Sequence, residues 1–223
     1  RTYFLGRSQP PFFGAMVNLY AQLTTKEKAL NYLGALQQEY DFWMDGAEQL
    51  SAENPTNRRV VKVRDFVLNR YYDDKSGPRP ESYREDVALA EGMDEETSKQ
   101  LFLDLRAACE SGWDFSARWF AEGNDFKTIR TSQILPVDLN SILYHTELVL
   151  SELYLEAGEA KLSRDYLKKA ENRYNAINSI FWNAEDAMYM DYLWTEQAFT
   201  GRISAASFYP MYFKAAQQNY ADL

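Results

Sequence analysis

The chain has 223 residues, of which 46% are hydrophobic and 26% charged, and this globular balance excludes an intrinsically disordered or fibrous protein. Its formal net charge of −9 disfavours binding to nucleic acid, because an acidic surface repels phosphate groups. The longest apolar stretches are shorter than the roughly 20 residues that span a bilayer, so no membrane-spanning helix is expected. A single cysteine, Cys109, and a single histidine, His145, exclude a disulfide framework and a Cys-based zinc site and disfavour a His-rich metal centre.

Helical periodicity dominates the first part of the chain. The Pro10–Pro11 pair suits the first turn of a helix, since a missing N–H costs nothing there, and an apolar run over 12–23 continues it. Thr24 and Glu27 form a capping-box pattern that predicts the start of a second helix. The buried face of that helix is predicted by apolar residues at intervals of three and four, namely Leu30, Leu33, Leu36, Tyr40 and Trp43.

The next segment departs from the helical pattern. Gly46 is expected to end the second helix. Residues 59–72 are rich in β-branched side chains and broken near Asp65, which predicts a short β-hairpin. Two prolines and a glycine within 73–82 exclude a helix interior and predict an ordered loop or an extended segment.

Helical patterns return in the second half. A helix is predicted over 95–110, and Asp138 is expected to cap a further helix. Residues 139–157 and 162–181 both carry apolar side chains at intervals of three and four. The two helices on either side of Gly158 should therefore form an αα-hairpin. A last helix is predicted over 203–216, with a proline inside it that should kink it or mark its start.

These elements predict an all-α protein with one small inserted β-hairpin. Linkers rich in glycine or serine are absent, so residues 1–223 are expected to form a single domain. Two architectures fit six or so paired helices, an α-solenoid or part of an (α/α)6 toroid of helical hairpins. No repeat of fixed period is visible, which disfavours the solenoid.

Three loop segments hold the conspicuous polar residues, namely 7–11, 78–82 and 110–116. Loops on a rigid helical scaffold commonly carry catalytic and binding groups. In the second loop, Arg79 and Glu81 are two apart in a segment expected to be extended, which would point both to one face. They could exchange hydrogen bonds with sugar hydroxyls, or they could form an ion pair that braces the loop.

Asp114 in the third loop lies between Trp113 and Phe115. Burial beside aromatic rings would raise the pKa of this carboxyl, which a general acid requires near neutral pH. The alternative is that Asp114 caps a helix beginning near Ser116.

Other polar groups allow simpler interpretations. In the first loop, Arg7 and Gln9 precede a helix N-terminus, where they could bind a ligand or form a solvated capping loop. His145 is expected at a surface or boundary position, and Cys109 in core packing. No P-loop, dinucleotide-binding turn or metal-binding motif is present.

Taken together and in order, these motifs resemble the trehalase family, and the resemblance covers essentially the whole chain. The segments that carry it are Arg7–Phe13, Phe42–Glu48, Pro78–Ser82, Ser111–Trp119, Arg130–Thr131, Pro136–Asn140, Ser204–Ala206 and Phe208–Pro210. Gly-Trp-Asp-Phe-Ser preceded by Arg-Ser-Gln-Pro-Pro and Arg-Pro-Glu-Ser is a specific combination.

The resemblance implies an α/α-toroid glycosidase that hydrolyses α,α-trehalose to two glucose molecules with inversion. It implies Asp114 as the general acid, and it implies no metal or other cofactor. The residues that would line the sugar subsites are Arg7, Ser8, Gln9, Arg79, Pro80, Glu81 and Gly112. The full-length protein is expected to be a monomer.

Departures from the family are also visible. Its members are much longer, and the resemblance places an upstream sugar-binding motif before Arg1 and the general-base glutamate after Leu223. The chain is therefore expected to be a central portion that is inactive alone. Tyr72 and Tyr83 stand where relatives tend to have Trp. A cytoplasmic and a periplasmic location both stay open, as do a helical-pair module that binds protein and a trehalose-binding remnant without catalysis.

Overall fold

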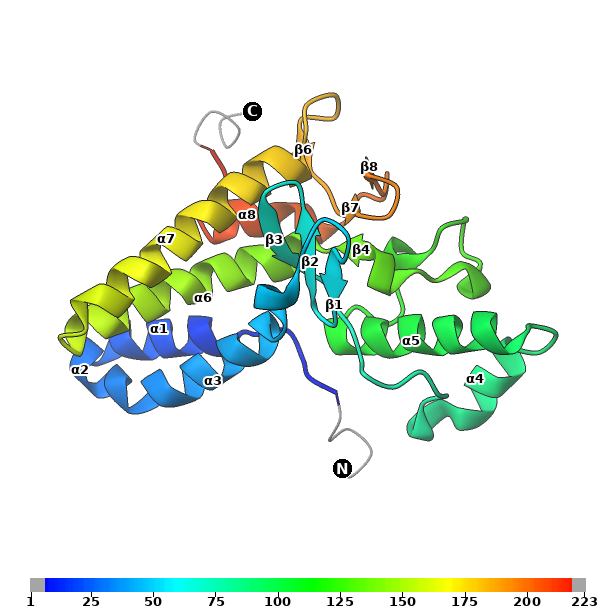
Figure 1. The fold of residues 1–223 in the computed structure, drawn as a ribbon, viewed down its shortest axis with the longest axis horizontal. Helices are drawn as coiled ribbons and strands as arrows, with labels where there is room; N and C mark the ends of the chain where they lie inside the picture. Colours follow the sequence, from blue (N-terminus) through cyan, green and yellow to red (C-terminus); the bar gives the residue numbers. More distant parts are fainter. Residues whose placement is uncertain (1–6, 218–223) are drawn as a thin grey trace.

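The computed structural model describes residues 7–217, and within them helices predominate (Figure 1). The helices are α1 (Phe13–Leu23), α2 (Lys26–Ala29), α3 (Leu33–Met44), α4 (Tyr83–Leu89), α5 (Glu95–Ser111), α6 (Val137–Glu156), α7 (Ala160–Ala176) and α8 (Tyr209–Tyr212). The strands are β1 (Thr56–Asn57), β2 (Val60–Val63), β3 (Phe66–Asn69), β4 (Ile134–Leu135), β5 (Trp182–Asn183), β6 (Met188–Tyr189), β7 (Tyr192–Leu193) and β8 (Ala198–Phe199). The predicted fold class, a helical protein built from paired helices, is confirmed.

Helices α1 to α3, α6 and α7 form one side of the molecule, which we call the helix-rich lobe (Figure 1). The predicted stripe of α3 is buried at Leu36, Tyr40 and Trp43. The capping prediction was wrong by one residue, because the Thr25 hydroxyl accepts the hydrogen bond from the Lys28 amide. A 3-10 turn then separates α2 from α3.

Helices α6 and α7 form the predicted αα-hairpin. Helix α6 is buried on most of its circumference, whereas α7 is amphipathic and covers it on one side. Asp138 does not cap α6 as predicted. It lies inside the first turn, where Arg118 binds its carboxylate, and the Val137 amide donates instead to Asp191.

The predicted hairpin is present, with β2 antiparallel to β3 and Val63 opposite Phe66. Arg64, in the turn, has a φ of 54°. The sequence patterns missed β1, which pairs with the other edge of β2, because two residues give no periodicity. This sheet lies between the helix-rich lobe and the rest of the chain (Figure 1).

The other side of the molecule, which we call the loop-rich lobe, comprises residues 70–135 and 182–208. It contains α4, α5 and small antiparallel sheets in which β4 pairs with β7, β7 with β8, and β5 with β6. The predicted last helix is mostly absent, because 203–216 forms a 3-10 turn followed by the short α8, with Pro210 in its first turn.

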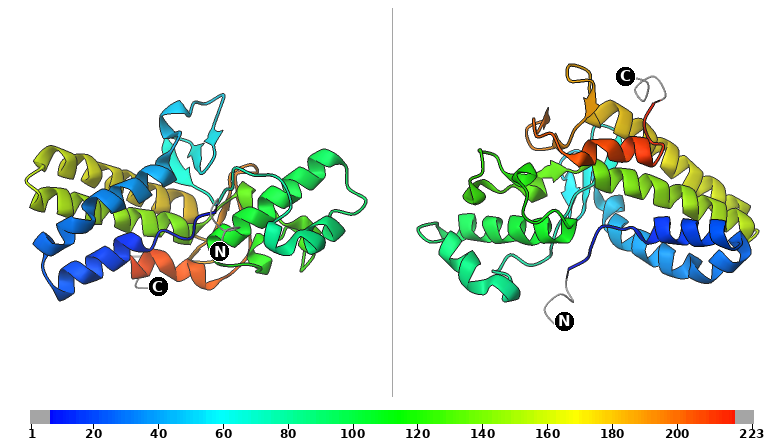
Figure 2. Two further views of the ribbon diagram at one scale, coloured as in Figure 1. Left: turned by 90° about the horizontal axis from the view of Figure 1, so that it is seen from below. Right: turned by 180° about the vertical axis from the view of Figure 1, so that it is seen from behind.

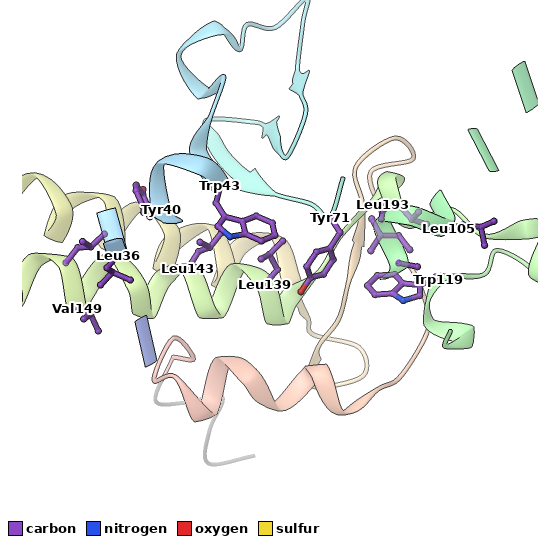
Figure 3. Packing of buried hydrophobic residues seen from close by; sticks show 14 of the residues in the cluster. Leu36, Tyr40, Trp43, Tyr71, Leu105, Trp119, Leu139, Leu143, Val149 and Leu193 are labelled. Atoms are coloured by element: carbon purple, nitrogen blue, oxygen red, sulfur yellow. The ribbon is translucent and has the colours of Figure 1, made fainter. Parts of the chain in front are cut away.

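A row of aromatic rings joins the two lobes (Figure 3). The Trp43 and Tyr71 rings meet edge to face with centroids 6.0 Å apart, and the Tyr71 and Trp119 rings do so at 6.2 Å. All three side chains are fully buried. Such edge-to-face pairs add roughly 0.5–1.5 kcal/mol beyond their burial, so the aromatic row contributes to holding the lobes at a fixed angle.

Candidate functional site

Residues 7–12, which lead into α1, contact the C-terminal end of α5 through Ser8 and Gln9. This segment runs between the two lobes before it enters α1 (Figure 2). The Ser8 hydroxyl donates to Glu110 Oε1 at 2.7 Å, and Gln9 Nε2 donates to the Cys109 carbonyl at 3.4 Å. Gly112 ends α5 with a φ of 72°, a conformation that favours glycine, and a Cβ at Gly112 would be in ordinary contact with the Pro10 ring. The first and third loops therefore lie side by side.

Arg79 ties the second loop to the same place. Its buried guanidinium binds the Asp86 carboxylate through Nε and Nη2, and its Nη1 donates to Cys109 Sγ at 3.2 Å. Its Cζ lies 4.8 Å from the centre of the Phe115 ring. Of the two alternatives for this loop, the ion pair between Arg79 and Glu81 does not form, because the Arg79 guanidinium binds Asp86.

Glu81 faces the first loop instead. The expectation of one extended face was wrong, since Pro80 begins a 3-10 turn that contains Glu81 and follows an extended Arg79. The Arg7 guanidinium forms an ion pair with Glu81 Oε1. Among the described residues, Glu81 Oε2 is buried and has no hydrogen-bond partner, so this oxygen can accept a hydrogen bond from a ligand.

Asp114 is exposed, so its predicted burial between aromatic rings was wrong. Phe115 turns away to pack on Phe126, with ring centroids 4.7 Å apart, and Trp113 lies under the Arg118 guanidinium. The alternative role as a cap is also wrong, because Ser116 supplies the cap itself. Within residues 7–217, the Asp114 carboxyl therefore forms no hydrogen bond or ion pair that would give it a structural role.

The charges of the three loops act together on Cys109. Burial raises the pKa of this thiol, Arg79 and Arg7 lower it, and Asp114 raises it further. All three charged groups are therefore within electrostatic range of one sulfur atom. Cys109 is half-buried and accepts from Arg79, so the prediction of simple core packing was incomplete.

Glu110 is a residue of the site that the sequence patterns missed. It is fully buried and accepts hydrogen bonds from Ser8, from Arg59 Nε and Nη2 at 3.0 and 2.8 Å, and from the Tyr72 amide at 2.8 Å. Burial raises the pKa of Glu110, and Arg59 lowers it. A glutamate beside the helix stop at Gly112 was the only local signal, and it is a weak one because acidic helix ends are usually solvated.

Arg118, in the 3-10 turn that follows the third loop, anchors this loop to the rest of the molecule. Its fully buried guanidinium binds Asp138 at 2.7 Å and Asp191 at 2.5 Å. These carboxylates belong to the first turn of α6 and to the segment just before β7. The loop that carries Asp114 is therefore anchored to both lobes.

This arrangement presents guanidinium donors, two carboxylates and an aromatic ring within one small region, a set suited to a neutral ligand with many hydroxyl groups. Within residues 7–217, no group of three or more His, Cys, Asp or Glu side chains is placed to hold a metal ion. None of the helices in this described part is long and apolar enough to cross a membrane. His145 is half-buried, in agreement with the predicted surface or boundary position. Its ring nitrogen lies 3.3 Å from Asn18 Nδ2 of α1, away from the three loops.

Comparison with known proteins gives consistent results. The family model described as Trehalase matches residues 1–223. The chain is 42% identical to a periplasmic trehalase of Citrobacter koseri and 41% identical to one of Xanthomonas axonopodis pv. citri, over 100% and 99% of its length. It spans only 39% of the length of each of these relatives.

Solved structures give the same fold. The neutral trehalase Nth1 from Saccharomyces cerevisiae matches with a TM-score of 0.74 and 22% identity, over 99% of this chain and 43% of that one. A GH63 mannosylglycerate hydrolase from Thermus thermophilus matches with a TM-score of 0.51 and 13% identity, over 97% of this chain and 53% of that one.

Proposed function

The chain belongs to the trehalase family, and on this basis we propose that it forms part of a glycoside hydrolase that cleaves α,α-trehalose into two glucose molecules. The observation that supports this most is the meeting of the three loops at the end of α5, where Arg79 and Gln9 both contact Cys109. A site for a disaccharide needs hydroxyl partners from several directions, and separate loops provide them.

In this proposal Asp114 is the general acid. It is exposed, is not used in any cap, and lies next to the Phe115 ring that packs on Arg79. The sugar subsites are assigned to Arg7, Ser8, Gln9, Arg79, Pro80, Glu81 and Gly112. Glu81 Oε2 is the acceptor best placed for a hydroxyl, since no described residue donates to it.

The proposed reaction is hydrolysis with inversion. Asp114 gives its proton to the glycosidic oxygen while a second carboxylate, about 6.5–9.5 Å away, activates water on the opposite face of the sugar. No residue of this chain is assigned to that second role. We expect the base from the part of the family's length that the chain does not match, so the chain alone should be inactive.

Three further assignments are part of this proposal. Residues 1–223 are taken as one domain, an incomplete segment of an α/α toroid, and the full-length enzyme as a monomer. Of the two compartments that the sequence left open, the periplasm is favoured because the relatives at 41–42% identity carry that name.

The test is proton NMR of trehalose incubated with the full-length enzyme that contains this chain. Equal amounts of α- and β-glucose at early times are expected, because inversion acts at one of the two anomeric carbons. Asp114→Asn should lower kcat by about 10²–10⁴-fold. Asp165→Asn, an exposed aspartate of α7, is the matched control and should leave the rate unchanged. Undiminished hydrolysis by Asp114→Asn would refute the role of Asp114, and no glucose from the unaltered enzyme would refute the proposed activity.

A trehalose-binding remnant without catalysis is the alternative that the same experiment distinguishes. Calorimetry would then detect trehalose binding to a full-length protein that releases no glucose. The protein-binding module required an Asp114 loop distant from Arg79, and the 4.8 Å contact of Arg79 with Phe115 removes that support.

A further inference from the structure

A polar cavity lies between the helix-rich lobe and the β2–β3 hairpin and uses none of the residues assigned above. Its volume is about 530 Å³, and its walls come from the end of α3, the loop 45–48, the turn between β2 and β3 with the start of β3, α7, and Glu147 of α6. Helix α7 and strand β3 lie next to each other at this place (Figure 1). A volume of this size accommodates a monosaccharide or a disaccharide.

A buried charged group borders this cavity. Glu147 is 1% exposed, and its Oε1 accepts hydrogen bonds from the Tyr40 hydroxyl and from Arg173 Nε, both at 2.9 Å. Its Oε2 is buried and has no hydrogen-bond partner among the described residues. Glu147, Tyr40 and Arg173 all line the cavity. A buried carboxylate oxygen without a donor is costly, so it favours a hydrogen-bond donor bound in the space beside it.

Arg173 cannot donate to Glu147 Oε2 without losing its contacts with other residues. Its Nη1 donates to the side-chain oxygens of Asn69 and Asn140, both at 3.0 Å, and its Nη2 contacts Met44 Sδ at 3.4 Å. The guanidinium is therefore held by the hairpin and by α6. This rigid backing keeps Glu147 in one position, as a binding site requires.

The rim of the cavity offers both donors and acceptors. Lys169 Nζ lies 5.0 Å from the centre of the Tyr40 ring, and the exposed Asn172 is one turn further along α7. Asp41 and Asp65 also line the cavity, and Phe66 adds a half-exposed ring. The residues that line the cavity include five carboxylates (Asp41, Asp45, Glu48, Asp65 and Glu147) and two cationic groups (Lys169 and Arg173), so the cavity repels anions. A neutral molecule with several hydroxyl groups can donate to the first and accept from the second.

We propose that this cavity is a second carbohydrate site, separate from the three loops, which binds a neutral polyhydroxylated molecule of hexose size. A ligand hydroxyl donates to Glu147 Oε2, Lys169 and Asn172 donate to other hydroxyls, and the Phe66 ring covers an apolar face of the sugar. The inference rests on the geometry of this cavity alone, so it does not depend on the proposed trehalose hydrolysis.

Glucose titration of the full-length enzyme that contains this chain, followed by ¹H–¹⁵N NMR, tests the proposal. The amide signals of Asp65, Lys169 and Asn172 should shift in a saturable way, independently of any change around residues 79–81. Lys169→Ala should weaken the glucose affinity read from these shifts by roughly tenfold, the value of a hydrogen bond to a charged group. Lys168→Ala, its exposed neighbour on α7, is the matched control and should leave the affinity unchanged.

Phe66→Ala, on the rim of the cavity, provides a second variant that leaves the Glu147–Arg173 pair intact and should also weaken binding. Shifts confined to the loops 7–11, 78–82 and 110–116 would overturn the proposal. So would the absence of any shift at tens of millimolar glucose, or equal affinities in Lys169→Ala and Lys168→Ala.

Discussion

The two lobes are stabilised in different ways. In the helix-rich lobe, apolar stripes on α3 and α6 bury Leu36, Trp43 and Leu143 completely or almost so. In the loop-rich lobe, and where it meets the sheet and α6, buried arginines bind buried carboxylates. The pairs are Arg59–Glu110, Arg79–Asp86, Arg106–Asp73 and Arg118 with Asp138 and Asp191. Within residues 7–217 the helix-rich lobe contains one comparable pair, Arg173–Glu147.

The difference follows from backbone hydrogen bonding. A helix satisfies its own amides and carbonyls, so its side chains are free to pack, whereas a buried loop needs side-chain partners to fix its path. Arginine provides several donors in a rigid fork, which suits this task. Buried ion pairs add little net stability compared with apolar packing, but they position the loops that carry Arg79 and Asp114.

The strongest effect is expected from the loss of a buried cation in the loop-rich lobe. Arg118→Met leaves Asp138 and Asp191 buried without a counter-charge, which should lower the free energy of unfolding by about 3–5 kcal/mol. Urea denaturation measures this, with Arg164→Met on the exposed side of α7 as the control. A loss below about 1 kcal/mol would mean that the loop-rich lobe does not depend on its ion pairs.

An apolar truncation in the helix-rich lobe gives the matching measurement. Leu36 is fully buried, so Leu36→Ala should cost about 3 kcal/mol through lost burial and the cavity that it leaves. Leu155→Ala, at a position that is 63% exposed, should cost far less. If Leu36→Ala were as mild as its control, the core of this lobe would be wrongly placed.

A smaller, pH-dependent effect is expected at Glu39 on α3. Burial raises its pKa from 4.5 to about 7, and among described residues its Oε2 has no partner. The protonated form is favoured on folding, so its contribution to stability is complete below about pH 4.5 and is lost as the pH rises through about 7.

Glu39→Gln should therefore be more stable than the unaltered chain by roughly 1–2 kcal/mol at about pH 8 and equal to it at about pH 4. Thermal unfolding of both proteins across this range measures the difference. Burial also raises the pKa of Asp104 to about 6, but that contribution is common to both proteins and cancels. A difference that does not change with pH would contradict the burial of Glu39.

The weakest effect concerns Cys109 at the proposed site. Cys109→Ala removes the sulfur that accepts from Arg79 Nη1, a hydrogen bond of roughly 0.5–1.5 kcal/mol. In the full-length enzyme, KM for trehalose should rise about threefold while kcat stays nearly unchanged, because Asp86 still holds Arg79. Steady-state kinetics of the variant and the unaltered enzyme measure this change in KM. An unchanged KM would show that the contact with Cys109 does not position Arg79.

The contrast between the lobes also shows which features local sequence patterns can predict and which they cannot. The α6–α7 hairpin and the buried stripe of α3 were predicted from spacing, since a helix repeats every 3.6 residues whatever surrounds it. The hairpin at β2 and β3 followed from β-branched residues around a turn. Local patterns were wrong for Asp138 and for the exposure of Asp114, whose surroundings come from distant segments.

Local sequence was enough for the helical pairs, the order of the three loops and membership of the trehalase family, because periodicity and motifs are properties of neighbouring residues. The partners of the buried charged groups could be identified only from the folded structure. Ser8 reaches Glu110 across 102 residues and Arg118 reaches Asp191 across 73. A carboxylate can be neutralised by any arginine that the fold brings near it, and no spacing rule encodes that choice. For the same reason, local sequence did not reveal Glu147, whose Oε2 has no partner among residues 7–217 and which lines a cavity.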